Sequence, residues 1–406
     1  MKNKIYIILF LFLLFASAKA QVRYKDKVFT EVNKDTSVYF GINPDYTGLP
    51  VSLFMDVYQP AGDTTSKRPL VIWVHGGGFV GGVRNDSLML GFCTDFSQRG
   101  YITSSIDYRL GGDLTDFTQL QKEATEAILR SVQDAKAAVR FFRKNASEYK
   151  IDTSLIIIAG TSAGGFTAVH TAYWDENEIP SNIDTATIGN IEGSSGNPGY
   201  SSKVQGVVNC WGAILDTNWI KAGNQPIVSV HGTADDVVPY DYGLSEGILP
   251  SYGSAAITRR AEGLDIPCAL RPFIGAGHTL AGGTNDEVAL KLDTADLFII
   301  DFLYRTFIEK ITSVPDLVNN NEKPLKVFPN PASDYVQIEY NVPESSNISL
   351  ILYDRLGRAI LTLESTFKAS GKYFLTQDIN NIPSGIYFLR EQCWGNVYIE
   401  KVVISN

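Results

Sequence analysis

A serine, an aspartate and a histidine occupy settings that could together support nucleophilic catalysis. Ser162 is the centre of Gly160-Thr-Ser-Ala-Gly164, which follows the apolar run Leu155–Ala159 and precedes a stretch typical of a helix. A G-x-S-x-G sequence between a strand and a helix forces a tight turn that exposes the serine hydroxyl near the N–H groups of the helix N-terminus. The pentapeptide alone is weak evidence, but its strand–turn–helix setting makes Ser162 the candidate nucleophile.

A serine hydroxyl needs an imidazole to remove its proton, and the chain contains only four histidines. Three are better explained as structural: His75 anchors its glycine-rich loop, His170 packs in the nucleophile's own helix, and His231 steadies a turn. His278 lies in a glycine-bracketed loop after the predicted strand Ala269–Phe273, from which a base can reach the carboxyl edge of a parallel sheet. We therefore predict that His278 is the general base.

The base needs a carboxylate that fixes its tautomer and stabilises the imidazolium. Asp235 and Asp236 follow the predicted strand Pro226–Val230, one strand before the histidine. The chain order is therefore Ser, Asp, His, as in α/β hydrolases. Two adjacent aspartates cannot both point inward, so one of them is a candidate and the other is a solvated neighbour or a cap. Asp216, after the preceding strand, is a more distant alternative.

A glycine-rich stretch, WVHGGGFVGG at residues 73–82, could bind the negative charge that such a reaction creates. It follows the apolar run Pro69–Val74, so the glycines begin where a strand is predicted to end. Glycine is retained where another group must approach the main chain closely. When a serine attacks a carbonyl, an oxyanion forms, and preorganised backbone N–H donors stabilise it by about 3–4 kcal/mol each. We expect the glycine stretch to supply such donors.

From about residue 24 to 312 the sequence alternates between short apolar runs and longer amphipathic stretches. The strands and helices that these segments form must position the candidate residues. This alternation of segments is typical of an α/β fold with a mostly parallel sheet and helices on both faces. Apolar residues at helical spacing predict a helix over Leu120–Lys144, and a last helix is predicted over Asp286–Glu309. The predicted strands are Val51–Val57, Leu70–Val74, Tyr101–Ile106, Leu155–Ala159, Val204–Cys210, Pro226–Val230 and Ala269–Phe273.

The N-terminus is predicted to be a signal peptide over residues 1–20. It combines a basic start (Met1–Lys4), an apolar run (Ile5–Phe15) and the small-residue cleavage pattern Ala18-Lys-Ala20. The apolar run is too short for a membrane span, which needs about 20 residues. No later segment reaches that length, so we expect export and no transmembrane segment in the mature chain.

The rest of the chain divides into a catalytic domain (21–312), a polar, proline-punctuated linker (313–324) and a second domain (325–406). The second domain shows only short strand patterns separated by turn residues, which predicts a small all-β, Ig-like sandwich. It contains no histidine, so we place the chemistry in the first domain. Its predicted strands are Tyr335–Tyr340, Ile348–Tyr353, Ala359–Leu363, Lys372–Leu375, Gly385–Arg390 and Val397–Ile404.

The composition and net charge of the chain limit the classes of molecule that it is expected to bind. The chain has 406 residues and a formal net charge of −9, from 35 basic and 44 acidic residues, with no basic run. This argues against nucleic acid or an anionic membrane as a partner. The cysteines lack metal-ligand spacing, so we predict no metal and no cofactor, and their pairing is left open. They are Cys93, Cys210, Cys268 and Cys393.

Taken in order, the motifs of about residues 50 to 305 resemble those of the HGGG-type α/β-hydrolase carboxylesterases, which include bacterial acetyl and feruloyl esterases. The motifs are HGGGFVGG, the segment IDYRL at 106–110, GTSAGG, HGTADDVVP and GAGH. In that family the first aspartate of the HGTADD pattern is the triad member, so the resemblance implies a triad of Ser162, Asp235 and His278.

The same resemblance implies an oxyanion hole. In esterases of this kind the residue after the nucleophile and the glycine loop of an earlier strand supply the N–H donors. In this sequence those residues are Ala163, Gly77 and Gly78. The polar, glycine-rich segment 173–203 follows the nucleophile helix, and we expect it to form a lid or pocket wall.

The C-terminal domain resembles the sorting domain of type IX secretion substrates in Gram-negative bacteria. The matching stretches are VFPNP at 327–331, ILYDRLGR at 351–358, IPSGIYFL at 382–389 and KVVI at 401–404. The resemblance implies that secretion machinery recognises this domain and carries the chain across the outer membrane. We therefore expect a secreted or cell-surface protein.

Three functions are compatible with these observations. The leading hypothesis is a serine carboxylic ester hydrolase that works through an acyl-enzyme on an ester substrate, such as acetyl or feruloyl esters of plant polysaccharide. A serine peptidase of the prolyl oligopeptidase type is less favoured, because such peptidases usually carry a large propeller domain. A non-catalytic surface binding module is a third hypothesis, but it would have no chemical reason to keep both the triad and the glycine loop.

Overall fold

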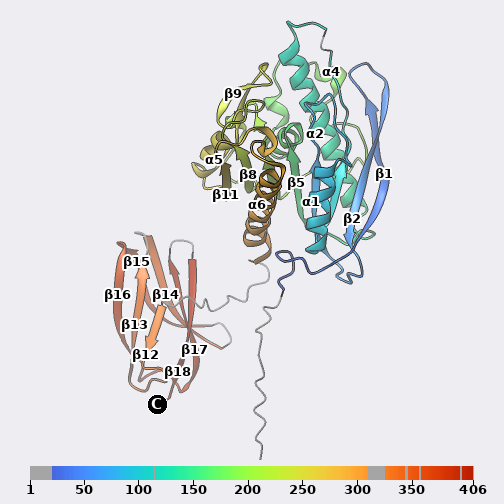
Figure 1. Ribbon diagram of the computed structural model, residues 1–406. Helices are drawn as coiled ribbons and strands as arrows, with labels where there is room; N and C mark the ends of the chain where they lie inside the picture. Colours follow the sequence, from blue (N-terminus) through green and yellow to red (C-terminus); the bar gives the residue numbers. More distant parts are fainter. Residues whose placement is uncertain are drawn as a thin grey trace, which may run out of the picture. The chain divides into compact units, whose positions relative to one another are not determined.

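In the computed structural model the chain divides into two compact units, Met1–Ile311 and Thr312–Asn406 (Figure 1). The expected signal peptide (1–20) and linker (313–324) lie outside the described residues. The residues that the structure describes are 21–113, 115–309, 325–342, 346–355, 358–393 and 396–405.

The first unit is built on an eight-stranded sheet with the order β1-β2-β4-β3-β5-β6-β8-β11. β1 and β2 pair antiparallel, as do β2 and β4, and all other neighbours are parallel. The sheet is therefore mostly parallel, as predicted. Its strands are β1 (Val32–Pro44), β2 (Pro50–Pro60), β3 (Arg68–Val74), β4 (Ile102–Ile106), β5 (Ile151–Thr161), β6 (Gly206–Cys210), β8 (Ile227–Gly232) and β11 (Cys268–Phe273).

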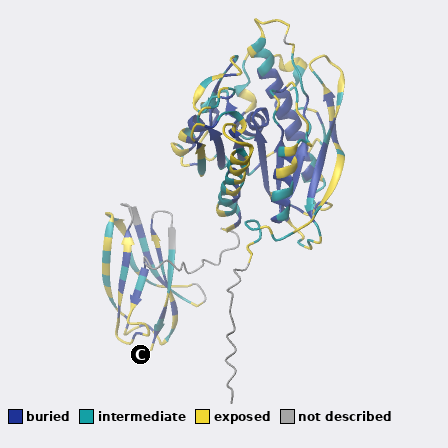
Figure 2. Cartoon of the chain, viewed as in Figure 1, coloured by how far each residue is buried: buried dark blue, intermediate teal, exposed yellow. Residues whose placement is uncertain are grey.

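Helices cover both faces of this sheet. On one face, α2, α3 and α5 pack into a core that includes Ile128, Phe166 and Ile257, and on the other face α1 and α6 pack around Phe96 and Ile299. Figure 2 shows most of α2 and of the central strands as buried. The helices are α1 (Ser87–Gln98), α2 (Leu120–Lys144), α3 (Ala163–Tyr173), the short α4 (Thr185–Ile188), α5 (Ser254–Glu262) and α6 (Asn285–Leu303).

Several features of the first unit differ from the predictions, and one of them is β1, which was not predicted. The predicted last helix ends at Leu303 and is followed by a π-helical turn over Tyr304–Ile308. A second, three-stranded sheet with the order β7-β10-β9 was not predicted. Its hairpin, β9 (Tyr242–Ser245) and β10 (Leu249–Gly253), is inserted between β8 and α5, and β7 (Ala213–Ile214) pairs with β10.

The second unit contains two antiparallel sheets with a shared apolar core, as predicted for a small β-sandwich. One sheet has the order β12-β13-β16 and the other β15-β14-β17-β18. Alternate residues of β13 and β17 are buried in the core, which matches the period-2 pattern of the sequence. The strands are β12 (Leu325–Phe328), β13 (Tyr335–Val342), β14 (Ser346–Asp354), β15 (Ala359–Lys368), β16 (Gly371–Asp378), β17 (Gly385–Cys393) and β18 (Asn396–Ile404).

One carboxyl group interrupts this apolar core. Glu391 lies on β17 between the buried residues Leu389 and Cys393, and its side chain is completely buried. Neither of its carboxylate oxygens has a hydrogen-bond partner among the described residues. Burial disfavours the charged form and raises the pKa of Glu391 to about 7.

This pKa predicts that the second unit loses stability as pH rises. The folded-state pKa lies above the unfolded-state value, so the contribution of Glu391 is fully present below about pH 4 and is lost as pH rises through 7. Glu391→Gln should therefore raise the free energy of unfolding of this unit by about 3 kcal/mol at pH 8 and leave it nearly unchanged at pH 4. Calorimetry of the full chain at both pH values tests this, and an equal effect at pH 4 and pH 8 would contradict it.

Candidate active site

Ser162 lies in a strained turn between β5 and α3. Its backbone has φ 53° and ψ −120°, a conformation that residues other than glycine rarely adopt. The turn packs directly against β3: a Cβ atom on Gly164 would lie 2.0 Å from the carbonyl oxygen of Val74. A side chain at position 164 would collide with β3, so only glycine fits there. This steric limit explains the last glycine of the G-x-S-x-G pattern.

The structure brings Ser162, His278 and Asp235 together in one chain of hydrogen bonds. His278 Nε2 lies 2.9 Å from Ser162 Oγ, and His278 Nδ1 lies 2.8 Å from Asp235 Oδ2. The serine follows β5, the aspartate follows β8 and the histidine follows β11, so three strand ends contribute one residue each. The imidazole therefore contacts the hydroxyl with one nitrogen and the carboxylate with the other.

Asp235 is held as a carboxylate. Burial opposes its ionisation, but hydrogen bonds from His231, His278 and the backbone N–H of Val238 outweigh burial and hold the pKa of the Asp235 carboxyl well below its usual value. Its Oδ1 accepts from the N–H groups of Val237 and Val238 at 2.9 Å each. A carboxylate fixed in this way can orient His278 and stabilise an imidazolium.

The other two aspartates considered from the sequence do not reach the histidine. Asp236 is exposed, and none of the described residues forms a side-chain hydrogen bond with it in the structure. Asp216 caps the 3-10 turn Thr217–Trp219 by accepting from the N–H of Asn218 at 2.8 Å. Of the three aspartates, the structure places only Asp235 against the candidate base.

The remaining histidines are buried and have other contacts. His75 Nδ1 lies 2.7 Å from the carbonyl oxygen of Gly76, and its ring stacks on Tyr108. His170 contacts the carbonyl oxygen of Phe166, and burial lowers the pKa of its ring to about 4. His231 Nε2 lies 3.2 Å from Asp235 Oδ2, so this residue supports the carboxylate rather than the serine.

The glycine stretch forms a tight loop beside Ser162. Its second glycine, Gly77, has φ 120°, and its carbonyl oxygen accepts from the N–H groups of Val80 and Gly81. Among the described residues nothing accepts a hydrogen bond from the N–H of Gly77 or of Gly78. Ala163 is the first residue of α3, so its N–H also lacks an intrahelical partner. None of the three predicted donors therefore has a competing acceptor among the described residues.

A pocket of about 160 Å³ opens next to Ser162. The glycine loop, the N-terminal half of α2, the start of α3 and the β9–β10 hairpin enclose it, and its lining is mainly apolar. The lining residues are Gly78, Phe79, Val80, Gly111, Gly112, Leu120, Glu123, Ala124, Ala127, Ser162, Ala163, Phe166, Val238, Ser245, Glu246, Ile248 and Leu249.

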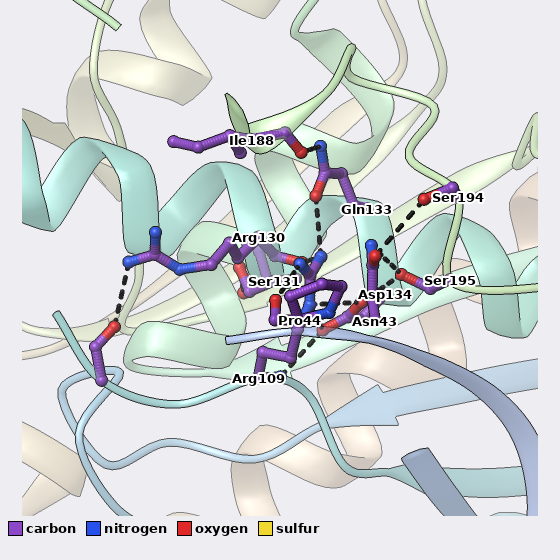
Figure 3. Close-up of polar contacts among 12 residues, drawn as sticks. Asn43, Pro44, Arg109, Arg130, Ser131, Gln133, Asp134, Ile188, Ser194 and Ser195 are labelled. Atoms are coloured by element: carbon purple, nitrogen blue, oxygen red, sulfur yellow. Dashed lines mark hydrogen bonds and ion pairs between the residues drawn. The ribbon is translucent and has the colours of Figure 1, made fainter. Parts of the chain in front are cut away.

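The expectation that segment 173–203 forms a lid or pocket wall is wrong for this pocket. None of its residues lines the pocket; the β9–β10 hairpin takes that place. The segment is instead bonded to α2 by buried polar groups (Figure 3). Ser195 Oγ donates to Asp134 at 2.6 Å, and Gln133 donates to the carbonyl oxygen of Ile188 at 3.1 Å.

Arg109, labelled in Figure 3, belongs to this network and lies close in sequence to a residue that contacts the glycine loop. The Arg109 guanidinium pairs with the fully buried Asp134 at 2.9 Å and donates to the carbonyl oxygen of Pro44. Two residues further on, the N–H of Gly111 donates to the carbonyl oxygen of Phe79 in the glycine loop at 2.7 Å. Arg109 therefore fixes the segment that holds one side of this loop.

We expect Arg109→Ala to destabilise the first unit by about 3–5 kcal/mol, because it leaves the Asp134 carboxylate buried without its partner. Chemical denaturation followed by circular dichroism measures this. The matched control is Arg259→Ala, which breaks an exposed ion pair with Asp241 and should cost less than about 1 kcal/mol. Equal losses in the two variants would contradict the assignment.

The sequence also led to predictions about metals, membrane spans and cysteines. In the described ranges no group of three or more His, Cys, Asp or Glu side chains is arranged to hold a metal ion. Within those same ranges no helix is long and apolar enough to cross a membrane. The four cysteines are not paired with one another; Cys268 is half-buried and the other three are buried.

Comparisons with known proteins match both parts of the chain. Residues 55–215 match the family BD-FAE, and residues 326–405 match the secretion system C-terminal sorting domain. Para-nitrobenzyl esterase of Bacillus subtilis is 31% identical over 130 residues, which are 30% of this chain and 25% of that protein. Carboxylesterase 1D of Mus musculus is 31% identical over 117 residues, which are 28% of this chain and 19% of that protein. The chain thus spans a quarter or less of the length of these relatives.

Among solved structures, esterase 2 of Thermogutta terrifontis phosphoramylated by tabun aligns with 66% of this chain and 94% of that chain, at 24% identity and a TM-score of 0.47. The mostly parallel sheet with helices on both faces, together with the family match, defines the class of the first unit as an α/β hydrolase. In particular, the first unit carries a BD-FAE domain, from a family of α/β-hydrolase esterases, and the second is a secretion system C-terminal sorting domain. The resemblances predicted from the motifs are thereby confirmed, and the sorting domain indicates type IX secretion to the cell surface or exterior.

Proposed function

We propose that this protein is a secreted serine carboxylic ester hydrolase that works through an acyl-enzyme on Ser162. The observation that carries the proposal is the hydrogen-bonded chain from Asp235 through His278 to Ser162, next to an apolar pocket and unpaired N–H donors. Acyl transfer requires a nucleophile, a base, an orienting carboxylate and donors for the oxyanion, and this site contains a candidate for each.

In the first half of the reaction, Ser162 Oγ attacks the ester carbonyl carbon while His278 Nε2 takes the hydroxyl proton. The carbonyl oxygen becomes an oxyanion and accepts hydrogen bonds from the N–H groups of Gly77, Gly78 and Ala163. His278 then gives the proton to the alkoxy oxygen, the bond between the carbonyl carbon and that oxygen breaks, and the alcohol leaves.

In the second half, water attacks the acyl-enzyme and His278 takes a proton from it. The bond between the acyl carbon and Ser162 Oγ breaks, the serine recovers its proton from the imidazolium, and the carboxylic acid leaves. Throughout, Asp235 keeps His278 in the tautomer whose Nε2 faces the serine. Acetyl or feruloyl esters of plant polysaccharide are the substrates we propose, because an exported hydrolase meets such polymers outside the cell.

The test is a single substrate panel for the chain from Gln21 to Asn406. The panel contains short-chain aryl acetates, methyl ferulate, acetylated xylan and a peptide anilide, and the released acid and alcohol are quantified. We expect ester cleavage with equimolar acid and alcohol, and no cleavage of the anilide. Cleavage of the anilide alone would favour a peptidase, and no cleavage by the folded protein would favour a binding module.

A further inference from the structure

The pocket beside Ser162 can be assigned to one side of the ester. In the proposed reaction the leaving alcohol must lie next to His278 Nε2, which protonates it. His278 is not among the residues that line the pocket, whereas Gly78 and Ala163, on the oxyanion side, are. The pocket therefore receives the acyl group. Its volume of about 160 Å³ is close to that of the cavities of about 150 Å³ that bind a benzene ring.

A glutamate in an unusual backbone conformation stands at the mouth of this acyl pocket. Glu246 and Gly247 form the turn of the β9–β10 hairpin, with φ 51° and 72°, and the N–H of Ile248 donates to the carbonyl oxygen of Ser245 at 2.9 Å. Turns with two positive φ angles favour asparagine or aspartate followed by glycine. A glutamate there is unfavourable for the turn itself, which suggests that its side chain serves another purpose.

The Glu246 side chain reaches the glycine loop. A Cβ atom on Gly78 would lie only 2.8 Å from Glu246 Oε1, so the carboxylate lies against the backbone that is proposed to bind the oxyanion. The hairpin is fixed in this place because the N–H of Glu246 donates to the carbonyl oxygen of Val237 at 2.8 Å. Gln121 of α2 also donates to the carbonyl oxygen of Ile248.

The charged residues that line the pocket are both acidic. Two carboxylates line it, Glu246 and Glu123, and none of its lining residues is a lysine or an arginine. Glu123 accepts a hydrogen bond from the N–H of Asp113 at 3.0 Å. The Glu246 carboxylate forms neither a hydrogen bond nor an ion pair with any side chain in the described part of the chain. Glu123 is paired with Lys122 at 3.7 Å, whereas the Glu246 carboxylate has no cationic side chain paired with it in the described part of the chain.

We propose that Glu246 is a specificity-determining residue that excludes negatively charged acyl groups from the pocket and favours neutral ones. The inference rests on the proposed ester hydrolysis and adds the charge class of the acyl group. A carboxylate on the acyl group would lie near Glu246, whose side chain is exposed at the mouth of the pocket, so the two like charges repel each other through a partly aqueous medium that salt can screen. The same repulsion acts on the acid product, which carries a negative charge at neutral pH.

The test compares two p-nitrophenyl esters of similar size, the 4-methylbenzoate and the 4-carboxybenzoate, which differ by one negative charge. The readout is the ratio of their kcat/KM values at pH 7. Glu246→Gln removes the charge and keeps the shape, so we expect the preference for the neutral ester to fall about tenfold. Glu246→Lys should lower it further. In the wild type, raising the salt concentration to about 1 M should also weaken the preference.

The matched control is Glu148→Gln, which changes the net charge equally but lies beyond the C-terminal end of α2, far from the Leu120 end that lines the pocket. This control should keep the wild-type ratio. A ratio in Glu246→Gln within about twofold of wild type would overturn the inference even if both esters are hydrolysed. If the wild type hydrolyses neither ester in a Ser162-dependent manner, the proposed function fails instead.

Discussion

Replacement of Ser162 by alanine is expected to lower kcat/KM for a neutral aryl ester by a factor of about 10⁴ to 10⁶. The variant removes the only atom that, in our proposal, bonds to the acyl carbon, while the unpaired N–H donors and the pocket remain. The residual activity should come from binding and from oxyanion stabilisation alone. Initial rates with the wild type and the variant, prepared in parallel, measure the effect.

The chain offers a matched control for this substitution. Ser245 lines the same pocket, but its Oγ contacts Ser251 Oγ at 2.6 Å and not a histidine. Ser245→Ala should keep kcat/KM within about tenfold of the wild type. If Ser162→Ala kept comparable activity, a different residue would have to be the nucleophile.

Asp235→Asn is expected to lower kcat by about 10⁴. The asparagine keeps the shape of the side chain, but its amide group can donate a hydrogen bond to His278 Nδ1. The proton of the imidazole would then lie on Nε2, which faces Ser162 and could no longer accept the serine proton. The variant should show a much smaller loss at high pH if hydroxide can partly replace the base, which a pH–rate profile measures.

The adjacent residue supplies the control for Asp235. Asp236 is exposed and differs from Asp235 by one position, so Asp236→Asn removes the same charge from the same loop. We expect kcat within about threefold of the wild type, as for most exposed substitutions. The reverse result, a large loss for Asp236 and a small one for Asp235, would reassign the orienting carboxylate.

The fold of the first unit was largely predictable because its central strands are buried on both faces and form continuous apolar runs. Each of the seven predicted strands corresponds to a strand of the sheet, and the predicted helix Leu120–Lys144 has the same bounds as α2. β1 was not predicted, because most of its first half is exposed and carries charged residues such as Lys34 and Asp35. A strand at the edge of a sheet with an exposed face has no continuous run of apolar residues by which it could be predicted.

The candidate catalytic residues could be predicted because they lie in short, recognisable sequence motifs. The G-x-S-x-G turn, the glycine loop and the two later strand ends lie in separate parts of the sequence, yet the ends of parallel strands meet at one edge of the sheet. This topology explains why Ser162, Asp235 and His278 are brought within hydrogen-bond distance, as the structure reports. Their catalytic roles remain predictions that the two substitutions above address.

The walls of the pocket were harder to predict because they depend on long-range contacts. Segment 173–203 has the polar, glycine-rich composition of a lid, but Asp134 and Gln133 bind it to α2. The hairpin between Tyr242 and Gly253 was not predicted because its Glu-Gly turn is not one of the residue pairs that favour such turns. Nothing in that pair of residues indicates that the turn reaches Gly78.

The most direct test of the central claim is covalent labelling of the nucleophile with a fluorophosphonate, followed by peptide mass spectrometry of the chain from Gln21 to Asn406. We predict one phosphonyl group per molecule, on the peptide that contains Ser162, and a loss of ester hydrolysis in proportion to labelling. Labelling of a different serine with the same loss of activity would contradict the account, as would full ester hydrolysis by a protein labelled on Ser162.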